Sequence, residues 1–203
     1  MTDVIRVVLL RQAGTPATRR GDFPADELLS VSGHRRAGSL SAYADGAAAW
    51  VSPAARAGET AELARLAGAR VDDRLRPLGS GAWAGRTLRD VEAAEPGAIA
   101  GWLGDPDARP PGGESIRELT ARVADLLAEW RGAASEPRTR PGPGGDRRIV
   151  AVTHAGVVRA AVLLALGAPI ESFGRIDVAP GSATELHTRG DGWAVVTVNR
   201  PPT

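Results

Sequence analysis

The sequence predicts an α/β fold, a three-layer α/β/α sandwich around a mixed, mainly parallel sheet. Apolar runs of strand length alternate with segments whose apolar residues recur at helical spacing, as in α/β domains. Residues 4–10, broken only at Arg6, and residues 148–152, which begin with Arg148, are apolar runs rich in β-branched residues, the pattern of strands buried on both faces. Polar turns that contain glycine follow both runs, as at the ligand-binding edge of such sheets.

Composition limits the class of protein. The 203 residues are 43% hydrophobic, enough for one core of ordinary size, so we expect a single domain over residues 1–203. With 25 basic and 24 acidic residues the net charge is +1, which favours neither nucleic acid nor a membrane as partner. All the basic residues are Arg and Cys is absent, which excludes Schiff-base lysines, thiol nucleophiles and disulfides. The N-terminus lacks a signal-peptide pattern, and we expect a cytoplasmic protein.

The first half of the chain alternates strands and helices. After the strand at 4–10, residues 15–24 form a loop rich in Thr, Pro, Arg and Gly. Ser32 is a suitable N-cap for a helix that runs to about residue 43. A short strand at 47–51 ends at Ser52, and Pro53 is placed to start a helix over 54–66. Residues 71–72 form a third short strand.

The second half continues this alternation. Residues 78–85 are loop-like, and short helices are expected at 88–95 and 98–103. Residues 114–130 carry a strong amphipathic stripe and predict a long helix. Residues 131–147 are rich in Pro, Gly and charge, so we expect a mobile surface loop within the domain. The strand at 148–152 precedes a helix over 157–166, and strands at 183–187 and 193–198 are joined by a turn at 190–192.

The candidate ligand site lies where the strands at 4–10 and 148–152 end. In open α/β sheets, ligands bind beyond the carboxyl ends of the strands, beside helix N-termini that attract anions. Arg11 offers a guanidinium there, Gly14 permits close backbone approach, and His154 follows the second strand. The alternative is that His154 only caps its helix and Arg11 only pairs with a carboxylate. Two such strand ends in one small domain favour the site.

Several segments, taken together, resemble the histidine phosphatase superfamily, the phosphoglycerate-mutase-like proteins, over residues 4–199. Leu9-Leu10-Arg11 followed by Gly14-Thr15 lies where that family has its Arg-His-Gly motif. Residues 52–61 match the segment Ser-Pro-x-x-Arg-Ala-x-x-Thr-Ala, and residues 75–85 match the Gly-x-Trp-x-Gly loop. The segments at 28–37, 111–115 and 152–159 complete the set in the family's order. The resemblance implies a phosphoglycerate-mutase-like fold.

The resemblance also implies roles for particular residues. In that family a phosphoryl group moves to a His beside the first Arg, two Arg and a second His hold the phosphate, and a carboxylic acid protonates the leaving oxygen. Arg11, Arg56 and His154 fall on the phosphate-holding positions, and guanidinium groups suit phosphate. We also expect Gly14 and Thr15 to contact substrate. Glu114 is a candidate carboxylate near the mouth of the site, or a helix N-terminal residue that interacts with the helix dipole.

Two departures from the family pattern bear on function. Gln12 stands where the nucleophilic His is implied, and a neutral amide nitrogen forms no useful phosphoenzyme. Pro77 stands where the proton-donating Glu is implied, and Ala13 replaces the glycine of the motif. The sequence therefore predicts a pseudophosphatase, a divergent member without the phosphohistidine nucleophile and without the acid.

Three functions remain open. The favoured interpretation is recruitment to acid–base chemistry of the lyase, cyclase or isomerase type on an anionic small metabolite, using His154 with Gln12, Arg11 and Arg56. The second is a non-catalytic binder or sensor of a phosphorylated or carboxylated ligand. The third is a residual small-metabolite phosphatase. We expect no cofactor, and no metal because three scattered His without Cys give no ligand spacing. An anionic small molecule is the expected partner, and a homodimer is a candidate assembly.

Overall fold

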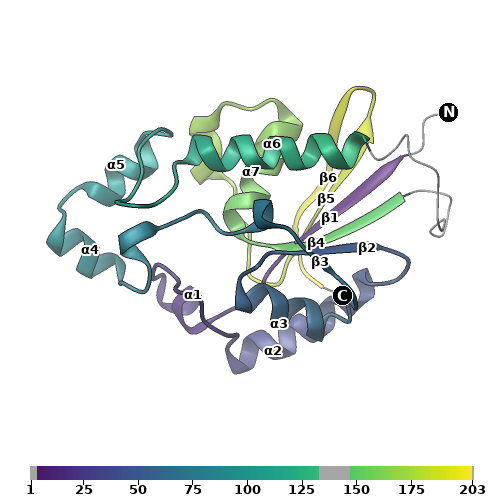
Figure 1. Ribbon diagram of the computed structural model, residues 1–203, viewed down its shortest axis with the longest axis horizontal. Coiled ribbons are helices and arrows are strands. Elements are labelled where there is room, and N and C mark those ends of the chain that lie inside the picture. Colours follow the sequence, from purple (N-terminus) through teal and green to yellow (C-terminus); the bar gives the residue numbers. More distant parts are fainter. Residues whose placement is uncertain (1–3, 133–146, 203) are drawn as a thin grey trace.

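The computed structural model describes residues 4–132 and 147–202, and over these residues it contains one six-stranded sheet between helical layers (Figure 1). The strand order is β3-β2-β4-β1-β5-β6. The pairs β1–β4, β4–β2 and β2–β3 are parallel, whereas β1–β5 and β5–β6 are antiparallel. The predicted mixed, mainly parallel sheet is confirmed. The strands are β1 (Ile5–Arg11), β2 (Ala48–Val51), β3 (Arg70–Val71), β4 (Arg147–Thr153), β5 (Ala183–Arg189) and β6 (Gly192–Arg200).

The helices cover both faces of the sheet, with α6 and α7 on one side and α2 and α3 on the other (Figure 1). The helices are α1 (Pro16–Arg20), α2 (Val31–Gly38), α3 (Ala55–Leu63), α4 (Leu88–Ala94), α5 (Ala98–Gly104), α6 (Ile116–Gly132) and α7 (Ala155–Leu166). Within the described residues, short 3-10 helices also lie at Ser39–Tyr43, Asp73–Leu75, Gly81–Trp83 and Ile170–Arg175. The three-layer arrangement agrees with the predicted fold class.

The central strand β1 is apolar on both faces because each face meets a different core. Val7 and Leu9 pack with α6 and α7, whereas Val8 and Leu10 pack with the side of the sheet that α3 covers. Alternate side chains of a strand point to opposite faces, so the apolar run from Val7 to Leu10 is what a doubly covered strand requires, and the exposed Arg6 lies near the start of the strand. This central placement fixes the end of β1 in the middle of the sheet edge.

A helix replaces part of the loop predicted at residues 15–24. Thr15 is the N-cap of α1: its side chain accepts from the Thr18 backbone N–H, and the Thr18 side chain accepts from the Thr15 backbone N–H. Pro16 occupies the first helical position, where its missing N–H costs nothing. Gly21 ends α1 with a positive φ of 75°. The capping box outweighs the turn-rich composition, and the loop prediction was wrong here.

The helix predicted from Ser32 to about residue 43 is two elements. Its N-cap is Ser30, whose side chain accepts from the Gly33 backbone N–H 3.1 Å away. The α-helical part ends at Gly38, and a 3-10 helix continues to Tyr43. The remaining boundaries shift by a few residues, as at helix ends generally. The loop predicted at 131–147 is shorter in the structure, because residues 131–132 belong to the end of α6 and Arg147 is the first residue of β4. Residues 133–146 lie outside the described residues.

An aromatic cluster fixes the segment after α1 beside α4 and α5. The ring of Phe23 lies 5.3 Å from that of Trp83 and 6.0 Å from that of Trp102. Because Phe23 is anchored in this way, its neighbours Asp22 and Pro24 are held at the edge of the cavity described below. Within the described part of the chain, none of the helices is long and apolar enough to cross a bilayer.

Candidate functional site

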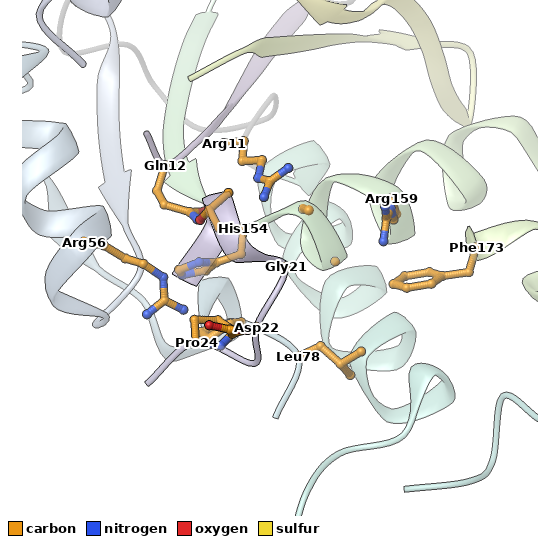
Figure 2. Close-up of a pocket in the computed structure, with 14 residues that line it drawn as sticks. Arg11, Gln12, Gly21, Asp22, Pro24, Arg56, Leu78, His154, Arg159 and Phe173 are labelled. Carbon is orange, nitrogen blue, oxygen red and sulfur yellow. The ribbon is translucent and has the colours of Figure 1, made fainter. Parts of the chain in front are cut away.

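The carboxyl ends of β1, β4 and β2 meet at one edge of the sheet, and the candidate site lies there (Figure 2). Arg11, the last residue of β1, is in register with Thr153 of β4. The Gln12 N–H donates to the Thr153 carbonyl at 2.8 Å, and the Ser52 N–H donates to the Val152 carbonyl at 3.0 Å. These backbone bonds extend the sheet by one residue past each strand. They place Gln12, His154 and Ser52 side by side.

A cavity of about 290 Å³ opens at this edge. The cavity is lined by the strand ends, by α1 and the segment after it, and by α3, α7 and residues 77–78. The lining residues are Arg11, Gln12, Thr18, Gly21, Asp22, Pro24, Arg56, Pro77, Leu78, His154, Ala155, Gly156, Arg159 and Phe173. The predicted residues Arg11, Gln12, Arg56 and His154 are therefore brought together.

Both predicted arginines are held by backbone carbonyls. Arg11 Nη1 donates to the Val178 carbonyl, and Arg56 Nη1 donates to the Ala25 carbonyl at 2.9 Å. The only carboxylate that pairs with Arg56 among the described residues is that of Asp26, 3.9 Å away and largely exposed. Burial lowers the pKa of Arg11 to about 10, with a further lowering by Arg159, and burial also lowers the pKa of Arg56. The site therefore holds positive charge that is only weakly compensated, because the carboxylate paired with Arg56 is distant and largely exposed.

Four buried polar atoms around the cavity have no hydrogen-bond partner among the described residues. They are Arg11 Nε, Arg56 Nε, His154 Nδ1 and Gln12 Oε1. Buried polar groups are nearly always hydrogen-bonded, so the free Nε–H donors of the two cationic side chains, Arg11 and Arg56, indicate a ligand with acceptor atoms. A phosphate or carboxylate oxygen would satisfy the arginine donors with charge-assisted hydrogen bonds.

His154 is neutral in this environment. Burial lowers its pKa well below the ordinary value, and the positive charges of Arg56 and Arg11 lower it further. Its Nε2 lies 2.7 Å from Ser52 Oγ, which also accepts from the Ala54 backbone N–H at 3.3 Å. If Ser52 donates its own proton to Nε2, the ring proton lies on Nδ1, the atom without a partner. His154 can then donate to an anion. Although it is the N-cap residue of α7, its side chain makes no capping bond.

Two other predicted residues support the site without lining the cavity. The Gly14 carbonyl accepts from the Ser30 N–H at 2.9 Å and from the Ser30 hydroxyl at 3.0 Å. Thr15 is fully buried, and its hydroxyl caps α1. The structure therefore assigns both residues to the turn that follows β1, and their polar groups are used within the protein.

Glu114 also lies outside the cavity-lining residues. Its carboxylate accepts from Arg122 Nε at 2.7 Å, from Arg122 Nη2 at 2.9 Å and from Arg76 Nη2 at 3.1 Å. The Gly79 N–H donates to it at 3.3 Å. Its oxygens are thus used in a buried ion pair. Sequence spacing gave no sign of this, because Arg122 reaches Glu114 from the second turn of α6.

Ten of the lining residues were not predicted as site residues, and three of these ten carry a charge or an aromatic ring. Arg159 follows Ala155 by four positions on α7, so both face the cavity, a spacing that could have identified it. Phe173 comes from the 3-10 helix Ile170–Arg175, and no sequence pattern linked it to the site. Asp22 lines the cavity while its carboxylate pairs with Arg20 Nε at 2.5 Å. Over residues 4–132 and 147–202, no group of three or more His, Cys, Asp or Glu is arranged to hold a metal.

Comparison with known proteins gives a consistent family. The model of the histidine phosphatase superfamily (branch 1) matches residues 7–201. No curated protein matches the chain at a significant level. A solved mycobacterial structure described as hydrolase 1 is 29% identical, with a TM-score of 0.82, and the match covers 98% of this chain and 99% of the other.

Two further solved structures are similar. A mycobacterial glucosyl-3-phosphoglycerate phosphatase, solved in complex with VO3, is 30% identical with a TM-score of 0.81, covering 96% of this chain and 98% of the other. The alpha-ribazole phosphatase of Shigella flexneri has a TM-score of 0.79 and covers 96% of both chains. At 22% identity the latter supports the fold alone.

Proposed function

Because this chain belongs to branch 1 of the histidine phosphatase superfamily, we propose that its cavity binds the phosphate group of a small phosphorylated metabolite. The cluster of unpartnered polar atoms carries the proposal: Arg11 Nε, Arg56 Nε and His154 Nδ1 are buried around one cavity. A tetrahedral dianion supplies several acceptor oxygens and compensates the buried guanidinium charges. The mycobacterial relative solved with VO3 supports an anionic ligand.

We also propose that Gln12 occupies the position of the family's nucleophile, and that no phosphohistidine forms. Gln12 is 5% exposed and lines the cavity beside His154 (Figure 2). Its amide can hydrogen-bond a phosphate oxygen but has no lone pair that serves as a nucleophile. Binding and phosphohistidine chemistry are thus separable in this site.

The test of binding is calorimetric titration with inorganic phosphate and with phenyl phosphate. Arg56→Gln is expected to weaken both by roughly 10- to 100-fold, because hydrogen bonds to charged groups contribute about 1.5–3 kcal/mol. Arg117→Gln is the matched control, since Arg117 is an exposed arginine whose pair with Asp107 lies outside the cavity. Equal affinity in wild type and Arg56→Gln would show that the cavity does not bind phosphate.

A second candidate is a small-metabolite phosphatase that uses direct attack by water. The comparisons favour it over the lyase, cyclase or isomerase interpretation, which no relative supports, because the similar solved structures include a hydrolase and a phosphatase. In this reaction the water oxygen bonds to phosphorus as the ester P–O bond breaks, and the water proton passes through solvent to the leaving oxygen. The Gln12 amide would orient the water, as side-chain amides do in GTPases.

Turnover of an activated aryl phosphate separates the two candidates. If wild type is inactive and Gln12→His gains turnover with an acid-labile phosphoenzyme, the protein is a phosphate binder. It then lacks phosphatase activity because the nucleophile is missing at position 12. If wild type turns over without a phosphoenzyme and His154→Ala abolishes turnover, the second candidate is correct. Each variant is first checked for phosphate binding and for the circular dichroism spectrum of wild type.

A further inference from the structure

The cavity has a second basic region at Arg159, away from Arg56. Figure 2 shows Arg56 and Arg159 on opposite sides of His154, with Arg11 between them. Arg159 Nε donates to the Ile176 carbonyl at 2.8 Å, and its guanidinium carbon lies 5.7 Å from the centre of the Phe173 ring. These contacts fix the guanidinium and leave its remaining donors available to the cavity.

One backbone segment orients two arginines. The carbonyl of Ile176 accepts from Arg159, and that of Val178 accepts from Arg11. Ile176 is extended, with φ −99° and ψ 114°. The two guanidinium groups lie close enough that the positive charge of Arg159 lowers the pKa of Arg11. This arrangement is built by the protein and needs no ligand.

Arg159 has no close counter-charge among the described residues. It forms no ion pair there, although the carboxylate of Asp177 is near enough to raise its pKa against a larger lowering by burial. Asp22, the carboxylate that lines the cavity, is paired with Arg20. A partly buried cation without a paired anion is costly unless a ligand supplies one.

The cavity also exceeds what one phosphate group fills. Its volume is about 290 Å³, far more than the roughly 10–15 Å³ that one water molecule needs by the same measure. Leu78 and Phe173 form an apolar wall next to Arg159. A phosphate held by Arg56, Arg11 and His154 therefore leaves both space and charge unused at the Arg159 end.

We propose that the ligand carries a second anionic group, a carboxylate or a second phosphate, and that Arg159 is the specificity residue that binds it beside Phe173. This inference rests on the proposed phosphate site and adds the substrate class: small metabolites with an anionic group at each end.

The test uses two ligand pairs that differ only in the second charge. The pairs are 3-phosphoglycerate with glycerol 3-phosphate, and 2-phosphoglycolate with 2-hydroxyethyl phosphate. Affinities are measured by calorimetry on wild type, Arg159→Gln and Arg159→Lys, with phosphate release monitored. In at least one pair, wild type is expected to bind the ligand that carries a carboxylate about tenfold or more tightly than the ligand that lacks it. Arg159→Gln is expected to remove this preference and to leave the affinity for the ligand without a carboxylate unchanged. Arg159→Lys is expected to retain part of the preference.

Three other outcomes have distinct meanings. If wild type shows no preference in either pair, the inference is wrong. If Arg159→Gln weakens both members of a pair equally, Arg159 contacts the phosphate itself and the inference is again wrong. If neither these ligands nor inorganic phosphate bind wild type, the proposed phosphate site fails, and the inference fails with it. Thermal unfolding of each variant verifies that loss of the Ile176 contact has not unfolded the protein.

Discussion

At the scale of single residues, burial decides the charge of His154. The side chain is 4% exposed and lies near Arg11 and Arg56, so its neutral form is favoured in the folded protein. In the unfolded chain the same imidazole takes up a proton as the pH falls through about 6.5. A pKa that is lower in the folded state means that stability is present above the unfolded pKa and is lost as the pH falls below it.

We therefore predict that His154 makes the ligand-free protein acid-sensitive. Between about pH 7 and about pH 5.5, wild type should lose roughly 1 kcal/mol more free energy of unfolding than His154→Gln, which has no proton to take up. Urea denaturation at the two pH values measures the difference. Parallel losses in the two proteins would mean that His154 is protonated in the folded state.

At the scale of elements, a missing side chain lets α2 approach the turn after β1. A Cβ at Gly33 would lie 2.2 Å from the Gly14 carbonyl oxygen, a backbone atom that cannot move independently. We predict that Gly33→Ala displaces this turn, lowers stability by about 1–3 kcal/mol and weakens phosphate binding. Gly38→Ala is the matched control in the same helix, because nothing lies within 4 Å of its added Cβ. It should leave binding unchanged and stabilise the protein by up to about 1 kcal/mol.

The buried ion pair between Glu114 and Arg122 connects α6 to the segment before the cavity wall. Besides Glu114, Arg122 donates to the carbonyls of Arg74, Arg76 and Pro77. Removal of one partner from a buried pair leaves the other charge and these carbonyls unsatisfied.

We predict that Arg122→Met costs about 3–5 kcal/mol of unfolding free energy, measured by urea denaturation. Arg117→Met, on the same helix but with an exposed ion pair, should leave the urea midpoint unchanged. Equal effects of the two substitutions would show that the Glu114 contacts contribute nothing to stability.

At the scale of the whole molecule, one sheet carries two cores. Leu126 of α6 lies in the core on one face, and Leu40 lies in the core on the other. We predict that Leu126→Ala and Leu40→Ala each destabilise the protein by about 2–5 kcal/mol. Because both cores share β1 and β4, the circular dichroism and tryptophan fluorescence transitions should coincide in each variant. Separate transitions would mean that the two layers unfold independently.

Much of the architecture could be predicted from local patterns. Apolar runs identified β1 and β4, because both faces of these strands are buried. The apolar stripe at residues 114–130 identified α6, because a helix buried on one side has apolar residues at helical spacing. The capping box of Thr15 and Thr18 is equally local, but the prediction for this segment used its composition alone. Arg11 and His154 were identified as candidates because each lies at the carboxyl end of a strand, whereas Arg56 was identified through the resemblance of residues 52–61 to a segment of the family.

The sequence by itself determined the fold class, the family resemblance and the identity of the residues at the strand ends, since these depend on neighbours along the chain. Only the tertiary structure decided which of those residues face the cavity. In the folded protein, Glu114 is paired with Arg122. Thr15 and Gly14 hydrogen-bond within the protein at the turn that follows β1. Arg159 and Phe173 line the cavity. The physical reason is that a polar side chain takes the partner nearest in space, and that partner is set by the order β2-β4-β1 and by the helices packed over it.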